Sequence, residues 1–266
     1  PPSSLQKDHV YYLKPTHAAG GVGGRRFVGN DGMMPLLDHL HQFPHTEWVL
    51  MDYIEGELIS LEGFVDQQGV NFLGFSSRKK VGNTESYVEF PHNSRISLNL
   101  QHHATTAVST LIARSHDTQG YFHTEFMMTK DSAYLIDANF GRIGGGALIE
   151  VIAHAYDISC IDIMQHIFLL SLYPERLPRS PYERCQRKGA AIHYSLPVSA
   201  KFLAIQENLS CQTKQTVLLS SGSIAPTVGE SNWSWVGFLS GDPLAVMADI
   251  NTIQITTDKG TFLPCF

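Results

Sequence analysis

The chain has 266 residues, of which 43% are hydrophobic, and 19 basic against 25 acidic residues give it a formal net charge of -6. This length and composition can build a sizeable core, which excludes intrinsic disorder and suits one large domain or two small ones. The acidic balance argues against a general binder of nucleic acid or of anionic membranes, because both attract basic proteins.

The first 54 residues predict a small α+β region with a glycine-rich loop. Val10 to Lys14 has the pattern of a short strand, and the segment THAAGGVGGRR precedes a second strand-like run at Phe27–Val28. Met33 to Phe43 carries apolar residues at helical spacing. Trp48 to Ile54 has the pattern of a strand that ends in the acidic turn EGE.

The middle of the chain predicts two hairpins separated by a helix. Leu58 to Val65 and Val70 to Ser76 flank the turn DQQG, which is typical of a hairpin. Residues 98–116 have the pattern of an amphipathic helix. Phe122 to Met128 and Tyr134 to Phe140 predict two strands around TKDS, followed by the glycine cluster GRIGGG.

The rest of the chain predicts a long apolar helix region, which is followed by a change in composition. Ala147 to Tyr173 is interrupted by acidic and histidine residues, so it never reaches about 18 consecutive apolar residues and predicts core helix rather than a membrane span. From about Leu177 the chain is polar and proline-bearing, and strands are predicted at Ala190 to Tyr194, Thr216 to Leu219 and Thr252 to Thr256. A domain boundary is expected there.

The cysteines bear on the compartment. They lie far apart, without a CxxC pair or a zinc-ligand spacing, so free thiols and a cytoplasmic protein are expected. These cysteines are Cys160, Cys185, Cys211 and Cys265.

The second hairpin carries the chemistry. If its turn is centred on Asp131, Glu125 lies opposite Asp137 and His123 lies opposite Asn139. Because side chains alternate between the two faces of a strand, these four residues are expected on one face of the hairpin. The other face is expected to carry the apolar residues Phe122, Phe126, Met128, Tyr134, Ile136, Ala138 and Phe140.

Opposed carboxylates repel each other unless something compensates, and a divalent cation would do so. Two carboxylates and an amide are oxygen ligands that suit Mg²⁺ or Mn²⁺, and Mg²⁺ is commonly completed by substrate phosphates. The alternative is a solvent-exposed strand face with ordinary polar residues, in which His123 only bonds a neighbouring strand.

Lys14 ends a strand just before the glycine-rich loop. Such a loop lets backbone N–H groups approach phosphate oxygens, and the lysine adds a point charge. The pattern is not a Walker A motif, which places its lysine after the loop. The alternative is an ordinary glycine-rich turn.

Taken in order, these motifs resemble the ATP-grasp superfamily, and within it the carboxylate–amine ligase branch that includes bacterial L-amino acid ligases. The ordered motifs are the strand lysine, the glycine-rich loop, MDYIEGE, the HxE strand, the DxN strand and the GGG helix start. The resemblance covers about residues 8–175. It implies an α+β fold in which two lobes clamp a nucleotide, with a small lobe at 1–54, a large lobe with the metal site at 55–176, and a β-rich C-terminal domain at 177–266.

The resemblance also implies roles for individual residues. Lys14 would contact phosphate, Arg142 would steady the reacting phosphoryl or acyl-phosphate group, and Mg²⁺ or Mn²⁺ would bind Glu125, Asp137 and Asn139. The remaining nucleotide contacts would come from Gly20, Gly21, Gly23 and Gly24 in the loop, from Met51, Asp52, Tyr53 and Ile54 at the hinge, from Glu57 at the ribose, and from Lys79 or its neighbours Arg78 and Lys80. The alternative for the apolar hinge residues is ordinary packing in a core. The alternative for Arg78, Lys79 and Lys80 is an ordinary solvated turn.

The chain departs from the family pattern in three places. Asn139 and Arg142 are separated by two residues instead of one, and Met51 stands where the hinge usually begins with Glu. The family's earlier lysine and N-terminal domain are absent from the sequence, so a fragment, or a partner chain that supplies these parts, is expected.

The function implied is an ATP- and Mg²⁺-dependent ligase that joins a carboxylate to an amine through an acyl phosphate, with an amino acid or peptide substrate. The alternative is a nucleotide-binding or regulatory module without catalysis. A biotin-carboxylase-like activity is less attractive, because the sequence has no carrier-protein or biotin feature. The expected partners are ATP, a small carboxylate and an amine, and a homo-oligomer is left open.

Overall fold

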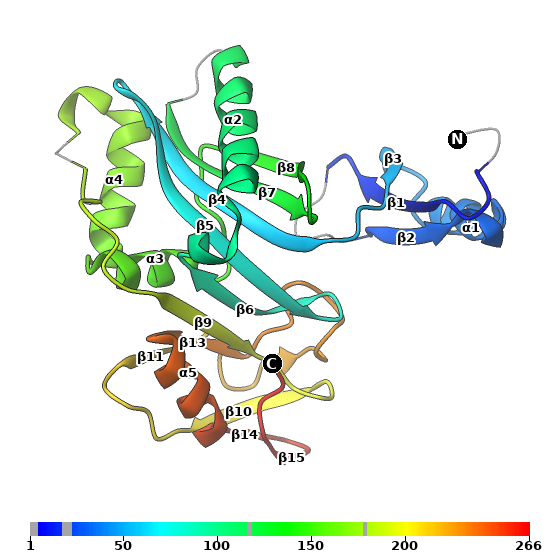
Figure 1. The fold of residues 1–266 in the computed structure, drawn as a ribbon. Helices are drawn as coiled ribbons and strands as arrows, with labels where there is room; N and C mark the ends of the chain where they lie inside the picture. Colours follow the sequence, from blue (N-terminus) through cyan, green and yellow to red (C-terminus); the bar gives the residue numbers. More distant parts are fainter. Residues whose placement is uncertain (1–4, 18–22, 116–118, 178–179) are drawn as a thin grey trace. The chain divides into compact units, whose positions relative to one another are not determined.

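The computed structural model describes residues 5–17, 23–115, 119–177 and 180–266 (Figure 1). By its internal contacts the chain forms two compact units. The first comprises Pro1–Glu55 with Ser231–Trp233, and the second comprises Gly56–Glu230 with Ser234–Phe266. The predicted domain boundaries at residues 54 and 176 stay a prediction.

The first unit is a three-stranded antiparallel sheet of order β2-β1-β3 with one helix, α1. Leu13, Phe27 and Leu36 form its buried core, so alternate residues of β1 pack inward while their neighbours face the other way. The elements confirm the predicted order of strand, strand, helix and strand. Their bounds are β1 Val10–Pro15, β2 Arg25–Val28, α1 Met34–Gln42 and β3 Trp48–Asp52.

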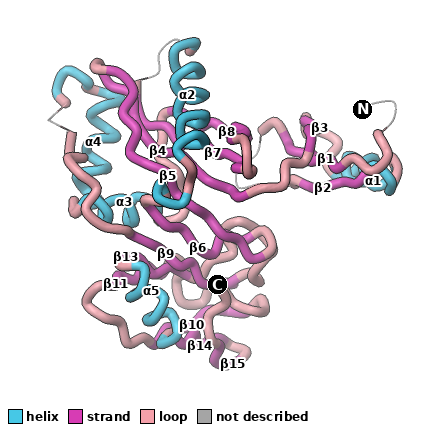
Figure 2. The backbone as a smooth tube through the Cα atoms, viewed as in Figure 1, coloured by secondary structure: helices cyan, strands magenta, loops and turns pink. Residues whose placement is uncertain are grey.

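The second unit is built on an eight-stranded sheet of order β11-β13-β9-β6-β5-β4-β7-β8, in which every neighbouring pair is antiparallel (Figure 2). Both predicted hairpins are confirmed. The bounds of the strands are β4 Glu57–Asp66, β5 Gly69–Val81, β6 Thr84–Phe90, β7 Gly120–Met128, β8 Ala133–Phe140, β9 Gly189–Tyr194, β11 Thr213–Val217 and β13 Gly237–Gly241.

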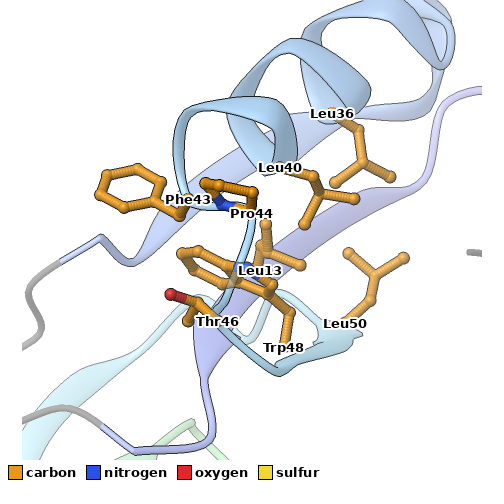
Figure 3. Close-up of a pocket in the computed structure, with 8 residues that line it drawn as sticks. All are labelled: Leu13, Leu36, Leu40, Phe43, Pro44, Thr46, Trp48 and Leu50. Carbon is orange, nitrogen blue, oxygen red and sulfur yellow. The ribbon is translucent and has the colours of Figure 1, made fainter.

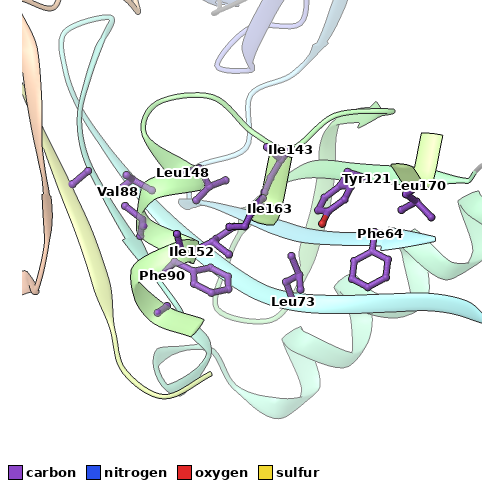
Figure 4. Packing of buried hydrophobic residues seen from close by; sticks show 14 residues of the cluster. Phe64, Leu73, Val88, Phe90, Tyr121, Ile143, Leu148, Ile152, Ile163 and Leu170 are labelled. Atoms are coloured by element: carbon purple, nitrogen blue, oxygen red, sulfur yellow. The ribbon is translucent and has the colours of Figure 1, made fainter. Parts of the chain in front are cut away.

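The two faces of the central strands are covered differently. One face is apolar along its length and packs against α2 (Leu98–Arg114), with Leu61 and Phe122 among its buried residues. The other face is apolar only at one end, where Phe64 and Tyr121 lie in the core cluster of α3 and α4 (Figure 4). The polar remainder of this face carries the candidate site.

The apolar region after GRIGGG forms two helices rather than one. α3 (Leu148–Tyr156) ends at Asp157, which has φ 58°, and α4 (Cys160–Leu172) begins with a capping box made by Ser159 and Asp162. Among the described residues no single helix has the length and apolarity to cross a membrane. α3 and α4 reach that length and composition only as a pair bent by 108°.

The last third of the chain contributes to both sheets of the second unit. β9, β11 and β13 continue the large sheet, and a separate four-stranded sheet has the order β12-β10-β14-β15. Its strands and the last helix are β10 Ala200–Gln206, β12 Ile224–Ala225, β14 Gln254–Thr257, β15 Gly260–Phe262 and α5 Pro243–Asp249. All four cysteines are free, as predicted.

One predicted face is wrong. The pairing of β7 with β8 shifts by one residue after Glu125, so Phe126 pairs with Leu135 and Met127 pairs with Tyr134. This β-bulge moves Tyr134 off the apolar face that the unbroken alternation predicted. Tyr134 is exposed, and so is Leu135, which takes the position opposite Phe126.

Candidate functional site

The polar face of β7 and β8 has the predicted pairing. Glu125 lies opposite Asp137, and His123 lies opposite Asn139. Directly opposed residues of antiparallel strands have Cα atoms about 4.5–5.5 Å apart. The Asn139 amide donates to Asp137 Oδ2 at 2.9 Å, so amide and carboxylate form one polar group at the end of β8.

β4 adds a buried acid to this group. Glu62 lies opposite His123 and is fully buried, and its Oε1 is 2.7 Å from Nδ1 of His123. Burial alone would lower the pKa of His123, but the charge of Glu62 and the hydrogen bonds of Glu125 and Glu62 raise it to about 9. His123 is therefore an imidazolium held between two carboxylates.

Glu125 is ionised at neutral pH. Burial opposes its ionisation, but the hydrogen bond and charge of His123, with the charges of Arg78 and Lys80, lower its pKa to about 2. Nε2 of His123 lies 3.4 Å from its Oε1. The strands thus present a carboxylate that keeps its charge across the physiological range.

The oxygens of Glu125, Asp137 and Asn139 fit a hard divalent cation such as Mg²⁺. Among the described residues no group of three or more His, Cys, Asp or Glu side chains is arranged to hold a metal ion. Two carboxylates and one amide leave up to half of an octahedral shell to other ligands, and Mg²⁺ sites that bind phosphates commonly complete the shell with phosphate oxygens and waters.

Beside these acids lies a buried ion pair that the sequence did not predict. Nη1 of Arg78 donates to Glu85 Oε2 at 2.6 Å, and the side chains are 6% and 3% exposed. Lys80 interacts electrostatically with Glu85 and Glu125, whereas Lys79 lies over the ring of Tyr87, 5.4 Å from its centroid. Arg78 and Lys80, rather than Lys79, are therefore the cations that act on the acidic face.

The comparisons with known proteins decide the family. The profile of the ATP-grasp domain matches residues 2–146, which is more than half of the chain. The chain belongs to the ATP-grasp family. No curated protein sequence matches the chain.

Solved structures show the same ATP-grasp fold at low identity. Phosphoribosylglycinamide synthetase from Anaerococcus prevotii matches 93% of this chain and 64% of its own length, with a TM-score of 0.68 and 14% identity. The biotin carboxylase domain dimer of 2-oxoglutarate carboxylase from Hydrogenobacter thermophilus, crystallised with MgADP and bicarbonate, matches 95% and 58%, with a TM-score of 0.68 and 14% identity. L-amino acid ligase from Bacillus licheniformis matches 89% and 59%, with a TM-score of 0.67 and 17% identity. The chain spans less than two thirds of each of these proteins.

Within this ATP-grasp chain, the first unit carries the predicted phosphate-binding residues. Lys14 pairs with Val49 and lies on the sheet face opposite its buried neighbour Leu13. Gly23 has φ +77°, and its carbonyl oxygen accepts a hydrogen bond from Nε2 of His39 at 2.8 Å. Gly24 directly precedes β2, whereas Gly20 and Gly21 lie outside the described residues.

The predicted hinge residues are not core residues. Asp52 and Tyr53 are exposed, and Met51 and Ile54 are half-buried. Oδ1 of Asp52 lies 2.8 Å from Nε2 of His9. The remaining ribose candidate, Glu57, is the first residue of β4, and its Oε1 is 3.6 Å from Nε2 of His92.

The first unit also has an apolar cavity of about 360 Å³ between α1 and the sheet (Figure 3). Its lining residues carry no charged side chain, and they include neither Lys14 nor the described glycines of the loop. Such a cavity offers no charge for phosphate, so it is not a candidate nucleotide site. The lining residues are Leu13, Leu36, Leu40, Phe43, Pro44, Thr46, Trp48 and Leu50.

A buried histidine of β9 predicts acid sensitivity. His193 is 1% exposed and stacks on Trp235, with 4.3 Å between the ring centroids. Burial and the charge of Arg78 lower the pKa of His193 from 6.5 to about 3, and a hydrogen bond to the Gly146 backbone opposes this shift only in part. Between these values the unfolded chain binds the extra proton, so acidification favours unfolding.

We expect the wild-type protein to lose about 2 kcal/mol of unfolding free energy between pH 7 and pH 5 that His193→Phe does not lose, since one pKa unit corresponds to about 1.4 kcal/mol. Urea unfolding at both pH values measures the difference. His102→Asn, at an exposed histidine of α2, is the matched control and should follow the wild type. Equal losses in wild type and His193→Phe would contradict the prediction.

Proposed function

We propose that the chain is an ATP- and Mg²⁺-dependent ligase that joins a carboxylate to an amine through an acyl phosphate. Members of the ATP-grasp superfamily are typically ligases of this kind. The observation that carries the proposal is the presentation of two carboxylates, Glu125 and Asp137, at directly paired positions, with Asn139 beside them. The family match ends at residue 146, so it includes all three residues and Arg142.

In the proposed reaction a carboxylate oxygen attacks the γ-phosphorus of ATP and ADP leaves, and an amine then attacks the acyl carbon and phosphate leaves. The chain would position the reactants and supply compensating positive charge, because the substrate carboxylate and the ATP phosphates are both anionic. Glu125, Asp137 and Asn139 would hold Mg²⁺, which supplies positive charge to the phosphates when bound. Arg142 would stabilise the charge that develops on the transferred group.

The other proposed nucleotide contacts come from residues of both units. Lys14 and the loop at Gly20, Gly21, Gly23 and Gly24 would bind phosphate oxygens. The hinge Met51–Ile54 would contact the adenine, and Glu57, in the second unit, would accept hydrogen bonds from the ribose. Lys80, whose charge acts on Glu125, is a better candidate for a phosphate contact than Lys79.

An amino acid or peptide is the proposed substrate class. The fold shared with an L-amino acid ligase agrees with this class.

The test has two steps on the full protein. Calorimetry with ADP and Mg²⁺ measures nucleotide binding, and ADP release from ATP is then followed across a panel of amino acids and dipeptides. We expect ADP release that needs both an acid from the panel and Mg²⁺, and that stops with a chelator. Binding without release would support the alternative, a nucleotide-binding module. Failure to bind Mg·ADP would contradict both.

A further inference from the structure

The segment between β8 and α3, residues 141–147, is the loop that carries Arg142. Arg142 is exposed, while the next residue, Ile143, is buried in the core cluster beneath α3. Three glycines follow, and Gly146 and Ala147 both have positive φ, at 69° and 60°. A non-glycine residue in that region is uncommon and is held there by its surroundings.

The surroundings of this loop are the buried pair Arg78–Glu85. Nη2 of Arg78 donates to the carbonyl oxygen of Gly145 at 3.3 Å, while Nη1 bonds Glu85. Nε of Arg78 and Oε1 of Glu85 are buried without a hydrogen-bond partner. Buried pairs with unpaired atoms add little to stability, so this one needs another reason to be present.

The loop backbone lies directly on these side chains. A Cβ atom at Gly144 would be 2.6 Å from Nδ1 of His123 and 2.8 Å from Nη2 of Arg78. A Cβ atom at Gly146 would be 2.3 Å from Oε1 of Glu85. The close approach therefore requires glycine at both positions, and it joins the loop to the histidine that contacts Glu125.

We propose that Arg78 and Glu85 are positioning residues, which fasten the loop backbone and thereby fix Arg142 beside the acidic face of β7 and β8. The inference rests on the proposed function, because it assigns Arg142 a part in the reaction. Arg78 links the loop to the sheet, since its guanidinium bonds both the Gly145 carbonyl and the Glu85 carboxylate. Loss of the pair would leave the nucleotide contacts in place and would misplace one catalytic group.

The first test measures the fastening without any turnover. Trypsin cleaves after Arg142 only when the loop opens locally, so the rate of cleavage at the Arg142–Ile143 bond, identified by mass spectrometry, reports its attachment. We expect Gly144→Ala to raise that rate at least tenfold. Gly145→Ala is the matched control, because a Cβ atom there meets nothing within 4 Å, and it should cleave at the wild-type rate. Equal rates in the two variants would overturn the proposal.

The second test separates positioning from simple structural support. Arg78→Lys and Glu85→Gln should lower the kcat of ADP release at least tenfold while KM for ATP and the Kd of Mg·ADP stay within threefold of wild type. Gly144→Ala should share this effect. A kcat per folded molecule that is unchanged in all three variants would overturn the positioning role.

The outcomes keep this proposal apart from the proposed function. If the wild-type protein released no ADP with any acid while Gly144→Ala still accelerated trypsin cleavage, the proposed ligase activity would be refuted. The positioning of a catalytic Arg142 would be refuted with it, and only the attachment of the loop to Arg78 and Glu85 would stand. A wild-type protein that turns over normally, with cleavage and kcat unaffected by the variants, would refute this inference alone.

Discussion

Glu125→Gln is expected to lower Mg²⁺-dependent ADP release about a thousandfold, since a metal that stabilises the charge of a transferring phosphoryl group contributes several kcal/mol. Glutamine keeps the shape of the side chain but removes the negative charge. That charge persists in the wild type because the pKa of Glu125 is held at about 2, chiefly by His123 against the effect of burial. The variant should remain folded, since Phe122 and Phe126 pack on the opposite face of β7.

The matched control lies on the same hairpin. Asp131 is exposed in the turn between β7 and β8, away from the paired acids, so Asp131→Asn removes one negative charge without touching them. It should retain wild-type ADP release, and both variants should keep the wild-type circular dichroism spectrum. Wild-type ADP release in Glu125→Gln would refute its role as a metal ligand.

The hairpin of β7 and β8 could be predicted because its determinants are local. The predicted pairs Glu125–Asp137 and His123–Asn139 are confirmed, and so is the face that these four residues share. The turn itself is not centred on Asp131, because Met128 pairs with Ala133, and the bulge after Glu125 brings the register to the predicted pairs. Two of the family motifs, HxE and DxN, lie on this hairpin, and the strand lysine and MDYIEGE lie on other short elements whose order along the chain indicated the ATP-grasp fold.

The rest of the site depends on β-bulges, which alternation does not reveal. The register shifts between Glu62 and Gly63, between Lys79 and Lys80, and after Glu125. The second shift pairs Lys80 with Glu85 and turns that acid onto the face of Arg78, so the buried ion pair depends on one unpaired residue in β6. The alternation in TESYVEF could have revealed the strand itself, but it could not have revealed its register.

Long-range pairing was also beyond local pattern. β6 joins β9, so residues about a hundred positions apart become neighbours and the last third of the chain extends the sheet that carries the site. The change in composition near Leu177 does not indicate which sheet the later strands join, because the edge of a sheet can pair with any strand of suitable pattern. The break between α3 and α4 depends on one residue, Asp157, in a left-handed conformation that aspartate tolerates better than most.

Glu62→Leu is expected to destabilise the second unit by about 3 kcal/mol, because removing one partner of a buried ion pair leaves the other charge uncompensated. Glu62 is fully buried, and its charge is the largest of the effects that raise the pKa of His123. In the variant, the imidazolium would keep only the longer contact with Glu125 at 3.4 Å. The midpoint of urea unfolding measures the loss.

A double variant shows whether the loss comes from the unpaired charge. Glu62→Leu combined with His123→Leu leaves no buried imidazolium, so it should be more stable than Glu62→Leu alone, as is found when buried pairs are replaced by apolar residues. The control is Asp157→Asn, which removes the acid of the exposed Arg187–Asp157 pair and should cost less than about 1 kcal/mol. If the double variant were instead less stable than Glu62→Leu, the loss of stability would come from altered packing rather than from an unpaired charge on His123.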